Sequence, residues 1–172
     1  MNLSATDFAL FGLPQRFAQE RSDIDARWKE LQRQAHPDRF AGQGASAERA
    51  ALQWSVRINE AYRRLKDPLQ RAAYLCQLLG APIDAEKNTA MPTDFLVEQM
   101  EWREALEDAA GEDALHELSD RVVKRRREML AHIGQLLDLE GDAPAAAQQV
   151  RALMFIERFA EDIEARLAQL GQ

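Results

Sequence analysis

Apolar residues recur at helical spacing along nearly the whole chain, and this pattern constrains the fold more than any other feature. One segment carries five of them at intervals that place them on one side of a helix: Leu115, Leu118, Val122, Met129 and Ile133. No stretch shows the sustained apolar–polar alternation of a half-buried strand. Glycine and proline, which interrupt helices, number only 8 and 6 among 172 residues. The sequence therefore predicts an all-α fold without a sheet.

Helix-breaking residues divide the first half of the chain into four helices. Gly12 ends a short first helix, and Pro37 forces the second helix to end before it. Serines at two helix starts are candidate N-caps, because their hydroxyls can accept from free backbone N–H groups. The predicted helices cover 7–12, from Ser22 to His36, from Ser46 to Asp67, and 69–79.

The second half reads as three helices joined by short connections. Their expected bounds are Pro92 to Ala109, Asp113 to Leu139 and Pro144 to Leu170. Each has an apolar stripe with charged residues elsewhere, and short connections make neighbouring helices antiparallel. We therefore predict a domain over 1–79, a linker over 80–91, and a three-helix bundle over 92–172.

The charge is divided unevenly between the two halves. The net charge is −7, yet residues 1–75 hold 12 Lys/Arg against 9 Asp/Glu, and residues 76–172 hold 10 against 20. Such a division suggests two modules with different partners, and the acidic second half argues against nucleic acid. The run from Lys124 to Arg127 sweeps around a helix, so we expect salt links to nearby carboxylates rather than one basic stripe.

No segment suggests a membrane or an oxidising compartment. Apolar runs fall short of the roughly 20 residues that a membrane span needs, and the start lacks the pattern of a secretory or transit segment. Cys76 is the only cysteine, so no internal disulfide can form, and its apolar neighbours suggest a buried, inert thiol. We expect a cytoplasmic protein.

The tripeptide His36-Pro37-Asp38 stands where an amphipathic helix stops and a glycine-containing loop begins. It can be a plain helix end and turn, with His36 complementing the helix dipole. A His36/Asp38 hydrolase is an alternative, but no convincing nucleophile lies near it in the sequence. The other histidines, His116 and His132, stand on a different helix without a cysteine pair. We therefore expect no enzyme site, metal, cofactor or small-molecule substrate.

Several segments together resemble the J-domain family. They are Leu10 to Pro14, Leu31 to Phe40, Ile58 to Tyr62, Leu65 to Pro68, and Arg71 to Tyr74, in the family's order and spacing. The resemblance implies a helical hairpin of helices II and III with short helices I and IV. It also implies that His36, Pro37 and Asp38 dock on a DnaK-class chaperone and stimulate its ATPase. Basic residues of helix II would help by pairing with an acidic chaperone surface: Arg27, Lys29 and Arg33.

The helix expected from Pro92 has apolar residues on two opposite sides. At about 100° per residue, Phe95, Gln99, Trp102 and Leu106 share one side, whereas Leu96, Val97 and Met100 lie opposite. Carboxylates continue that second side: Glu101, Glu104, Glu107 and Asp108. The second apolar group can be part of one wide core stripe or pack on the N-terminal half. Otherwise it is left for a partner.

The run Phe95 to Glu104 behind a J-domain resembles the HscB family of co-chaperones in iron–sulfur cluster assembly, over nearly the whole chain. The resemblance implies binding of the IscU-type scaffold through residues of the bundle's first and last helices: Leu96, Val97, Met100, Glu101, Glu104, Asp108 and Phe155. Val97 and Asp108 are conservative departures from a larger Met and Glu.

The same resemblance implies a role without catalysis by this chain. The protein would deliver the scaffold to an HscA-type chaperone, stimulate ATP hydrolysis there, and promote cluster transfer to acceptor proteins. The chain has no counterpart of the cysteine-pair zinc element of some eukaryotic relatives, which fits a bacterial-type member. The alternative is a J-domain protein that serves a different client.

Overall fold

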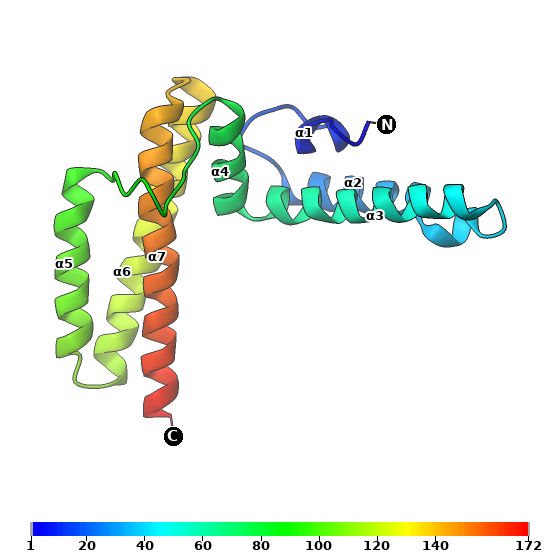
Figure 1. Ribbon diagram of the computed structural model, residues 1–172. Helices are drawn as coiled ribbons and strands as arrows, with labels where there is room; N and C mark the ends of the chain where they lie inside the picture. Colours follow the sequence, from blue (N-terminus) through cyan, green and yellow to red (C-terminus); the bar gives the residue numbers. More distant parts are fainter. Residues whose placement is uncertain (1, 172) are drawn as a thin grey trace. The chain divides into compact units, whose positions relative to one another are not determined.

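The computed structural model describes residues 2–171, which form seven α-helices and no strand (Figure 1). This confirms the predicted all-α fold. Backbone contacts divide the chain into two compact units, Met1–Leu75 and Cys76–Gln172. The division falls inside the fourth helix, four residues before the boundary expected after Leu79. None of the helices in the described part of the chain is long and apolar enough to cross a membrane.

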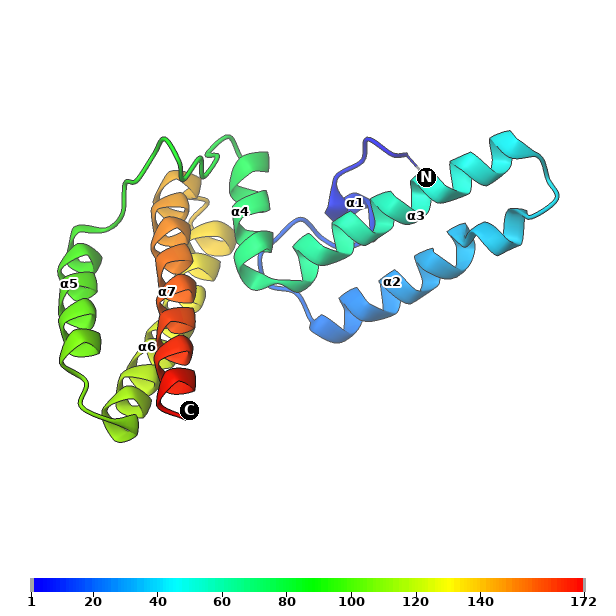
Figure 2. The ribbon, with the colours of Figure 1, turned by 60° about the horizontal axis from the view of Figure 1, so that its bottom comes forward.

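The first unit is built around an antiparallel pair of long helices. These are α2 (Arg21–Ala35) and α3 (Ala45–Lys66), joined through the turn Pro37–Phe40 (Figure 2). The short helix α1 (Asp7–Leu10) packs on α3. Helix α4 (Pro68–Leu78) follows α3 in sequence. The core of the unit consists of side chains that are almost fully buried: Phe8, Phe11, Ile24, Ile58 and Leu65.

The two predicted serine N-caps, Ser22 and Ser46, are each wrong by two residues. Helix α2 begins at Arg21, with Glu20 as an extended N-cap that gives no side-chain hydrogen bond. Ahead of it, the Arg71 guanidinium lies over the Phe17 ring and its Nε donates to the Phe17 carbonyl at 2.8 Å. This tertiary contact positions the chain just before α2, so local sequence propensity alone does not determine the residue at which α2 begins. Helix α3 begins after Gly44, whose φ of +105° favours glycine.

A buried carboxylate ties α1 to α3. Asp7 is fully buried, and its oxygens accept from Arg64 at 2.6 and 2.9 Å and lie 2.8 Å from Arg57 Nη1. The hydrogen bond to Asp7 raises the pKa of Arg64. The Asp7 backbone N–H also donates to the Tyr74 hydroxyl at 3.0 Å. The Asp7 carboxylate thus holds α1 against α3, and its backbone N–H joins α1 to Tyr74.

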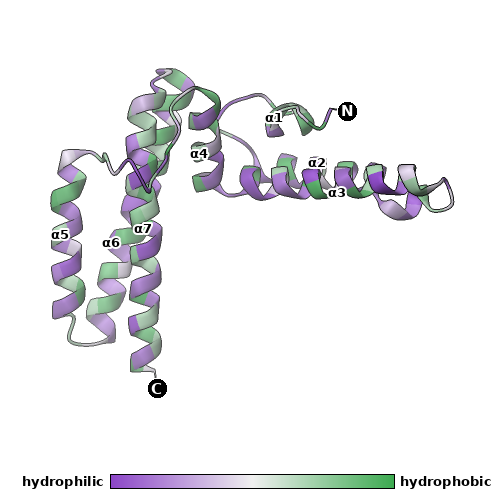
Figure 3. Cartoon of the chain, viewed as in Figure 1, coloured by the Kyte–Doolittle hydropathy of each residue, from purple (hydrophilic) through white to green (hydrophobic). Residues whose placement is uncertain are grey.

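The second unit is a three-helix bundle, as predicted. Its helices are α5 (Thr93–Asp108), α6 (Glu112–Gly134) and α7 (Ala143–Leu170), and a π-helical turn over Gln135–Leu139 follows α6. The most extensive contact joins α6 and α7, and Figure 3 shows apolar residues along all three helices. Four aromatic rings join α5 to α7 in the core: Phe95, Trp102, Phe155 and Phe159.

A buried arginine fastens the segment that precedes α5. The Arg151 guanidinium donates to the carbonyls of Ile83 at 2.9 Å, Ala90 at 3.2 Å and Pro82 at 3.4 Å. The residues expected to form a linker are therefore bound to α7 at both of their ends. Nearby, Cys76 is fully buried, as predicted, and burial raises the pKa of its thiol to about 11.

Candidate functional site

The His36-Pro37-Asp38 segment forms the corner between α2 and α3. Helix α2 ends at Ala35, because the residue before a proline favours the extended conformation, which His36 adopts with φ −59° and ψ 131°. Pro37 then opens a single 3₁₀ turn that ends at Phe40. The His36 side chain is 55% exposed and that of Asp38 is 92% exposed. Both functional groups are therefore displayed to solvent on a constrained backbone.

The hydrogen bonding of His36 does not fit a catalytic dyad. Its Nδ1 accepts from the Asp38 backbone N–H at 3.2 Å, so the neutral imidazole carries its proton on Nε2. The Asp38 Oδ2 lies 3.6 Å from the same Nδ1. A carboxylate that orients a general base instead accepts a hydrogen bond from the N–H of that nitrogen. Here the imidazole caps the 3₁₀ turn through Nδ1, and its side chain is more than half exposed.

Polar and aromatic contacts hold the helices that display this corner. Trp28 stacks on Tyr62 with ring centroids 4.5 Å apart, and its Nε1 donates to Asn59 Oδ1 at 3.0 Å. Gln32 Nε2 donates to the same oxygen at 2.6 Å. Asn59 thus receives two bonds from α2. Sequence reasoning missed these residues as supports of the loop, although Ile58 to Tyr62 was one of the segments that resembled the J-domain.

The three basic residues assigned to α2 do not share one surface. Lys29 and Arg33 line a shallow depression of about 490 Å³ that reaches His36 and Arg39. Arg27 is not part of it: a Cβ added at Gly12 would lie 3.2 Å from Arg27 Nη1, so that guanidinium lies against the turn after α1. The structure therefore groups Lys29 and Arg33 with the loop and separates Arg27 from it.

Arg33 is not a free cation in this depression. Its Nη2 donates to both carboxylate oxygens of Glu30, at 2.8 and 2.9 Å. This hydrogen bonding, with a further bond from Gln34, lowers the pKa of Glu30. A partner carboxylate would have to compete with Glu30 for Arg33. Both side chains are exposed, and an exposed pair of this kind is weak and exchangeable.

The second candidate surface is the outer side of α5. Phe95 and Trp102 on its inner side are almost fully buried, which fixes the rotation of the helix. Leu96, Val97 and Met100 consequently stand 45%, 55% and 65% exposed. Three carboxylates that are also exposed continue this side of the helix: Glu101, Glu104 and Asp108. The second apolar group is therefore not a wide core stripe of the bundle.

Phe155 differs from the other residues assigned to this surface because it is 8% exposed. Its ring packs edge-on against Phe95 at 5.8 Å and stacks with Phe159 at 5.8 Å, while the Arg103 guanidinium lies 5.2 Å above it. The structure thus brings Phe155 under α5 rather than beside its exposed residues. Direct contact of Phe155 with a partner stays a prediction that this arrangement does not favour.

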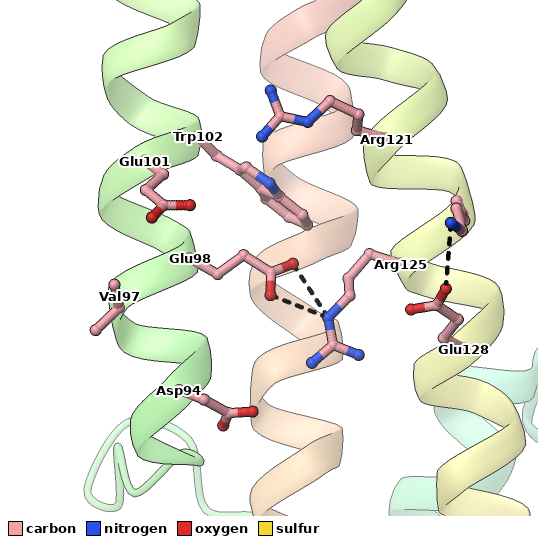
Figure 4. Close-up of a pocket in the computed structure, with 9 residues that line it drawn as sticks. Asp94, Val97, Glu98, Glu101, Trp102, Arg121, Arg125 and Glu128 are labelled. Atoms are coloured by element: carbon pink, nitrogen blue, oxygen red, sulfur yellow. Dashed lines mark hydrogen bonds and ion pairs between the residues drawn. The ribbon is translucent and has the colours of Figure 1, made fainter.

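A groove of about 360 Å³ separates α5 from α6 (Figure 4). Trp102 is one of the residues that line it. Across the groove, Arg125 Nε donates to the two carboxylate oxygens of Glu98, at 3.1 and 3.2 Å. Arg126 pairs with Glu157 of α7 at 3.2 Å, and Lys124 lies 3.9 Å from Glu128. These ion pairs confirm the salt links expected for the basic run. The groove adjoins the outer side of α5 because Val97 and Glu101 belong to both.

No group of three or more His, Cys, Asp or Glu side chains arranged to hold a metal occurs between residues 2 and 171. The structure presents two exposed surfaces with the predicted site residues. One is a rigid polar corner at the end of a helical hairpin, and the other is an apolar and acidic helix face. Because they lie in different units, each can be altered without touching the other.

Residues 91–164 match the family model described as the HSCB C-terminal oligomerisation domain. The chain is 48% identical over 173 aligned positions to the co-chaperone protein HscB homolog of Burkholderia mallei strain SAVP1, covering 99% of this chain and 98% of that protein. The homolog of Burkholderia thailandensis is 46% identical with the same coverage. These similarities extend over both units.

Solved structures agree with the sequence similarity. The chaperone HscB from Vibrio cholerae superposes with a TM-score of 0.82 at 36% identity, covering 96% of this chain and 99% of its own. The human co-chaperone protein HscB superposes with a TM-score of 0.88 at 25% identity, covering 96% of this chain and 84% of its own.

Proposed function

This chain belongs to the HscB family of co-chaperones, and we propose that it delivers an IscU-type iron–sulfur scaffold to an HscA-type, DnaK-class chaperone. In this role it stimulates the ATPase of the chaperone and thereby promotes cluster transfer to acceptor proteins. The chain breaks no bond itself. Its contribution is to bring two proteins together and to trigger hydrolysis in one of them.

The observation that carries the proposal is the exposed apolar group on α5. Leu96, Val97 and Met100 together leave a contiguous apolar surface in solvent, flanked by carboxylates. Burying exposed apolar area stabilises a complex by roughly 25 cal/mol per Å², and charged neighbours fix the register of the partner. The scaffold surface that covers α5 should accordingly be apolar at its centre and basic beside it.

Phe155 enters the proposal with a changed role. Its ring supports Phe95 from below, and Phe95 fixes the rotation of α5. Truncating Phe155 would then weaken scaffold binding by loosening the helix rather than by removing a contact. The guanidinium of Arg103 covers the Phe155 ring, so a partner at this position would contact Arg103 rather than Phe155.

The chaperone-binding role falls to the corner His36-Pro37-Asp38. The side chains of His36 and Asp38 are both more than half exposed, and within residues 2–171 neither forms an ion pair with a residue of another helix. Lys29 and Arg33 extend this surface along the depression beside the loop, where they suit an acidic chaperone surface. Arg27 contributes less, because its guanidinium lies against Gly12.

Calorimetric titration with the scaffold tests the client half of the proposal. The double variant Leu96→Ala plus Met100→Ala should weaken binding by about tenfold or more, because central apolar contacts carry most interface energy. The matched control, Val123→Ala plus Leu139→Ala, removes exposed apolar groups elsewhere in the same unit and should bind as the unaltered chain does. If the unaltered chain does not bind the scaffold, the client assignment is wrong.

A further inference from the structure

The groove between α5 and α6 has one cation whose carboxylate partner is not supplied by the bundle. Of the basic residues that line it, Arg125 is bound to Glu98, and Lys124 lies near Glu128. Arg121 extends from α6 toward α5 above the Trp102 ring (Figure 4). No ion pair involving Arg121 is present within residues 2–171. Arg121 is exposed, and it lines the same groove as Val97 and Glu101 of the outer α5 side.

The surface around Val97 is therefore electrically divided. Along α5 it presents the carboxylates Glu101, Glu104 and Asp108, all exposed, whereas across the groove it presents Arg121. A uniformly basic partner surface that covered Val97 and extended over the groove would bring a cation against Arg121. Like charges placed together across an interface are unfavourable and exclude wrong partners.

We propose that Arg121 is a specificity-determining residue that receives a carboxylate side chain of the scaffold in the α5–α6 groove. The inference rests on the proposed function, because the scaffold is the partner that covers Val97. A guanidinium suits this task, since its fork of N–H donors matches a carboxylate bidentately. The buried Trp102 ring beneath the groove also keeps its floor apolar on one side.

The proposal defines the chemistry of the matching scaffold surface. Basic side chains should face the α5 carboxylates, an apolar centre should cover Val97, and one Asp or Glu should lie beyond them toward α6. Packed helix axes are typically about 8–10 Å apart, so this acidic residue should lie roughly that far from the basic ones. A partner without it would bind in the same place more weakly.

Charge reversal with a matched control tests this residue. Arg121→Glu should weaken scaffold binding about five- to twentyfold at low salt, and the loss should shrink as salt rises. Arg127→Glu makes the same charge change on the same helix, at an exposed position outside the groove, and should change affinity less than about twofold. Arg121→Gln should fall between them. It removes the cation without creating a carboxylate that could draw Arg125 away from Glu98.

A compensating exchange identifies the carboxylate itself. Surface Asp and Glu residues of the scaffold are changed singly to Lys, and one of them should restore affinity for the Arg121→Glu protein. Equal losses for Arg121→Glu and Arg127→Glu, or the failure of every scaffold variant to restore binding, would overturn the inference. Binding by the unaltered chain separates these results from failure of the proposed function, in which no variant or control binds.

Discussion

The loop at His36 is shaped by backbone conformation, whereas the outer side of α5 is shaped by side-chain packing. The loop is set by the backbone: Pro37 stops a helix, and the His36 imidazole caps the turn that follows. The α5 surface is set by side chains, because Phe95 and Trp102 turn the helix so that Leu96 points to solvent. A site that the backbone determines can be recognised from a motif of three residues, whereas the exposed face of a helix depends on how the helix packs on the core.

The supports of the two sites differ in the same sense. Beneath the loop, α2 and α3 are joined by hydrogen bonds to Asn59 and by the Trp28–Tyr62 stack. Beneath α5 lies a cluster of aromatic rings, and none of its side chains takes part in a hydrogen bond with another described residue. The α5 surface should therefore respond to apolar truncation and the hairpin to changes in polar groups. Four variants test this contrast, beginning with the one that should destabilise the protein most.

Truncating the aromatic support of α5 should have the largest effect. Phe95→Ala removes a fully buried ring that contacts Trp102 and Phe155, and should destabilise the second unit by about 3–5 kcal/mol. Urea unfolding combined with hydrogen exchange by mass spectrometry measures the change by region. Exchange should rise in α5 and stay unchanged in α2. The control Val97→Ala, at an exposed site, should shift stability by less than about 0.5 kcal/mol.

Removing the buried carboxylate should affect the first unit instead. Asp7→Ala leaves Arg57 and Arg64 without their shared anion, and breaking such a buried pair costs about 3–5 kcal/mol. The same exchange measurement should now show the loss in α1 and α3. Asp23→Ala, at an exposed position in the first turn of α2, should cost less than about 1 kcal/mol. Equal effects of the two variants would contradict the assigned role of Asp7.

Releasing the segment before α5 should have an intermediate effect. Arg151→Met leaves the carbonyls of Pro82, Ile83 and Ala90 without their donor and should cost about 2–3 kcal/mol. Exchange should accelerate between residues 81 and 92 before it does so in α6. Arg158→Met, an exposed site on the same helix, is the control. If hydrogen exchange in residues 81–92 is equally slow in both variants, the Arg151 contacts do not hold that segment.

A hydroxyl deletion in the hairpin should have the smallest effect. The Tyr62 hydroxyl donates to Asp25 at 2.8 Å, and together with Arg21 it lowers the pKa of Asp25. A lowered folded-state pKa contributes stability above the unfolded-state pKa, and that contribution is lost as pH falls through the folded-state value. Tyr62→Phe should raise the pKa of Asp25 in an NMR titration and weaken the acid dependence of hairpin stability. Tyr74→Phe should leave the pKa of Asp25 unchanged.

The sequence predicted the helices well because each had a clear stripe and a breaker at its end. Gly12, Pro37 and Pro68 each stand two residues beyond the last residue of the helix that they end. The starts of α2 and α3 could not be predicted in the same way. At α2, the contact between Phe17 and Arg71 decides where the chain turns, and the partners are 54 positions apart. Local propensity contains no information about such a contact.

The candidate sites were predicted unevenly for a similar reason. The exposed side of α5 followed from helical phase, because only one side of that helix meets the bundle. The phase of Phe155 was uninformative, since α7 is buried on several sides at once, with Val150, Ile156 and Phe159 all in the core. Asp7, Arg151 and Arg121 owe their roles to residues far away in sequence. Nothing in their immediate neighbours distinguishes them from surface charges.

The central claim is that the loop activates the chaperone and the α5 surface selects its client. Steady-state ATPase of the HscA-type chaperone tests it most directly, with the unaltered chain and with His36→Gln, each with and without scaffold. His36→Gln should leave hydrolysis at its basal rate, while calorimetry shows unchanged scaffold binding. A His36→Gln protein that stimulates hydrolysis as well as the unaltered chain would show that the loop does not activate the chaperone.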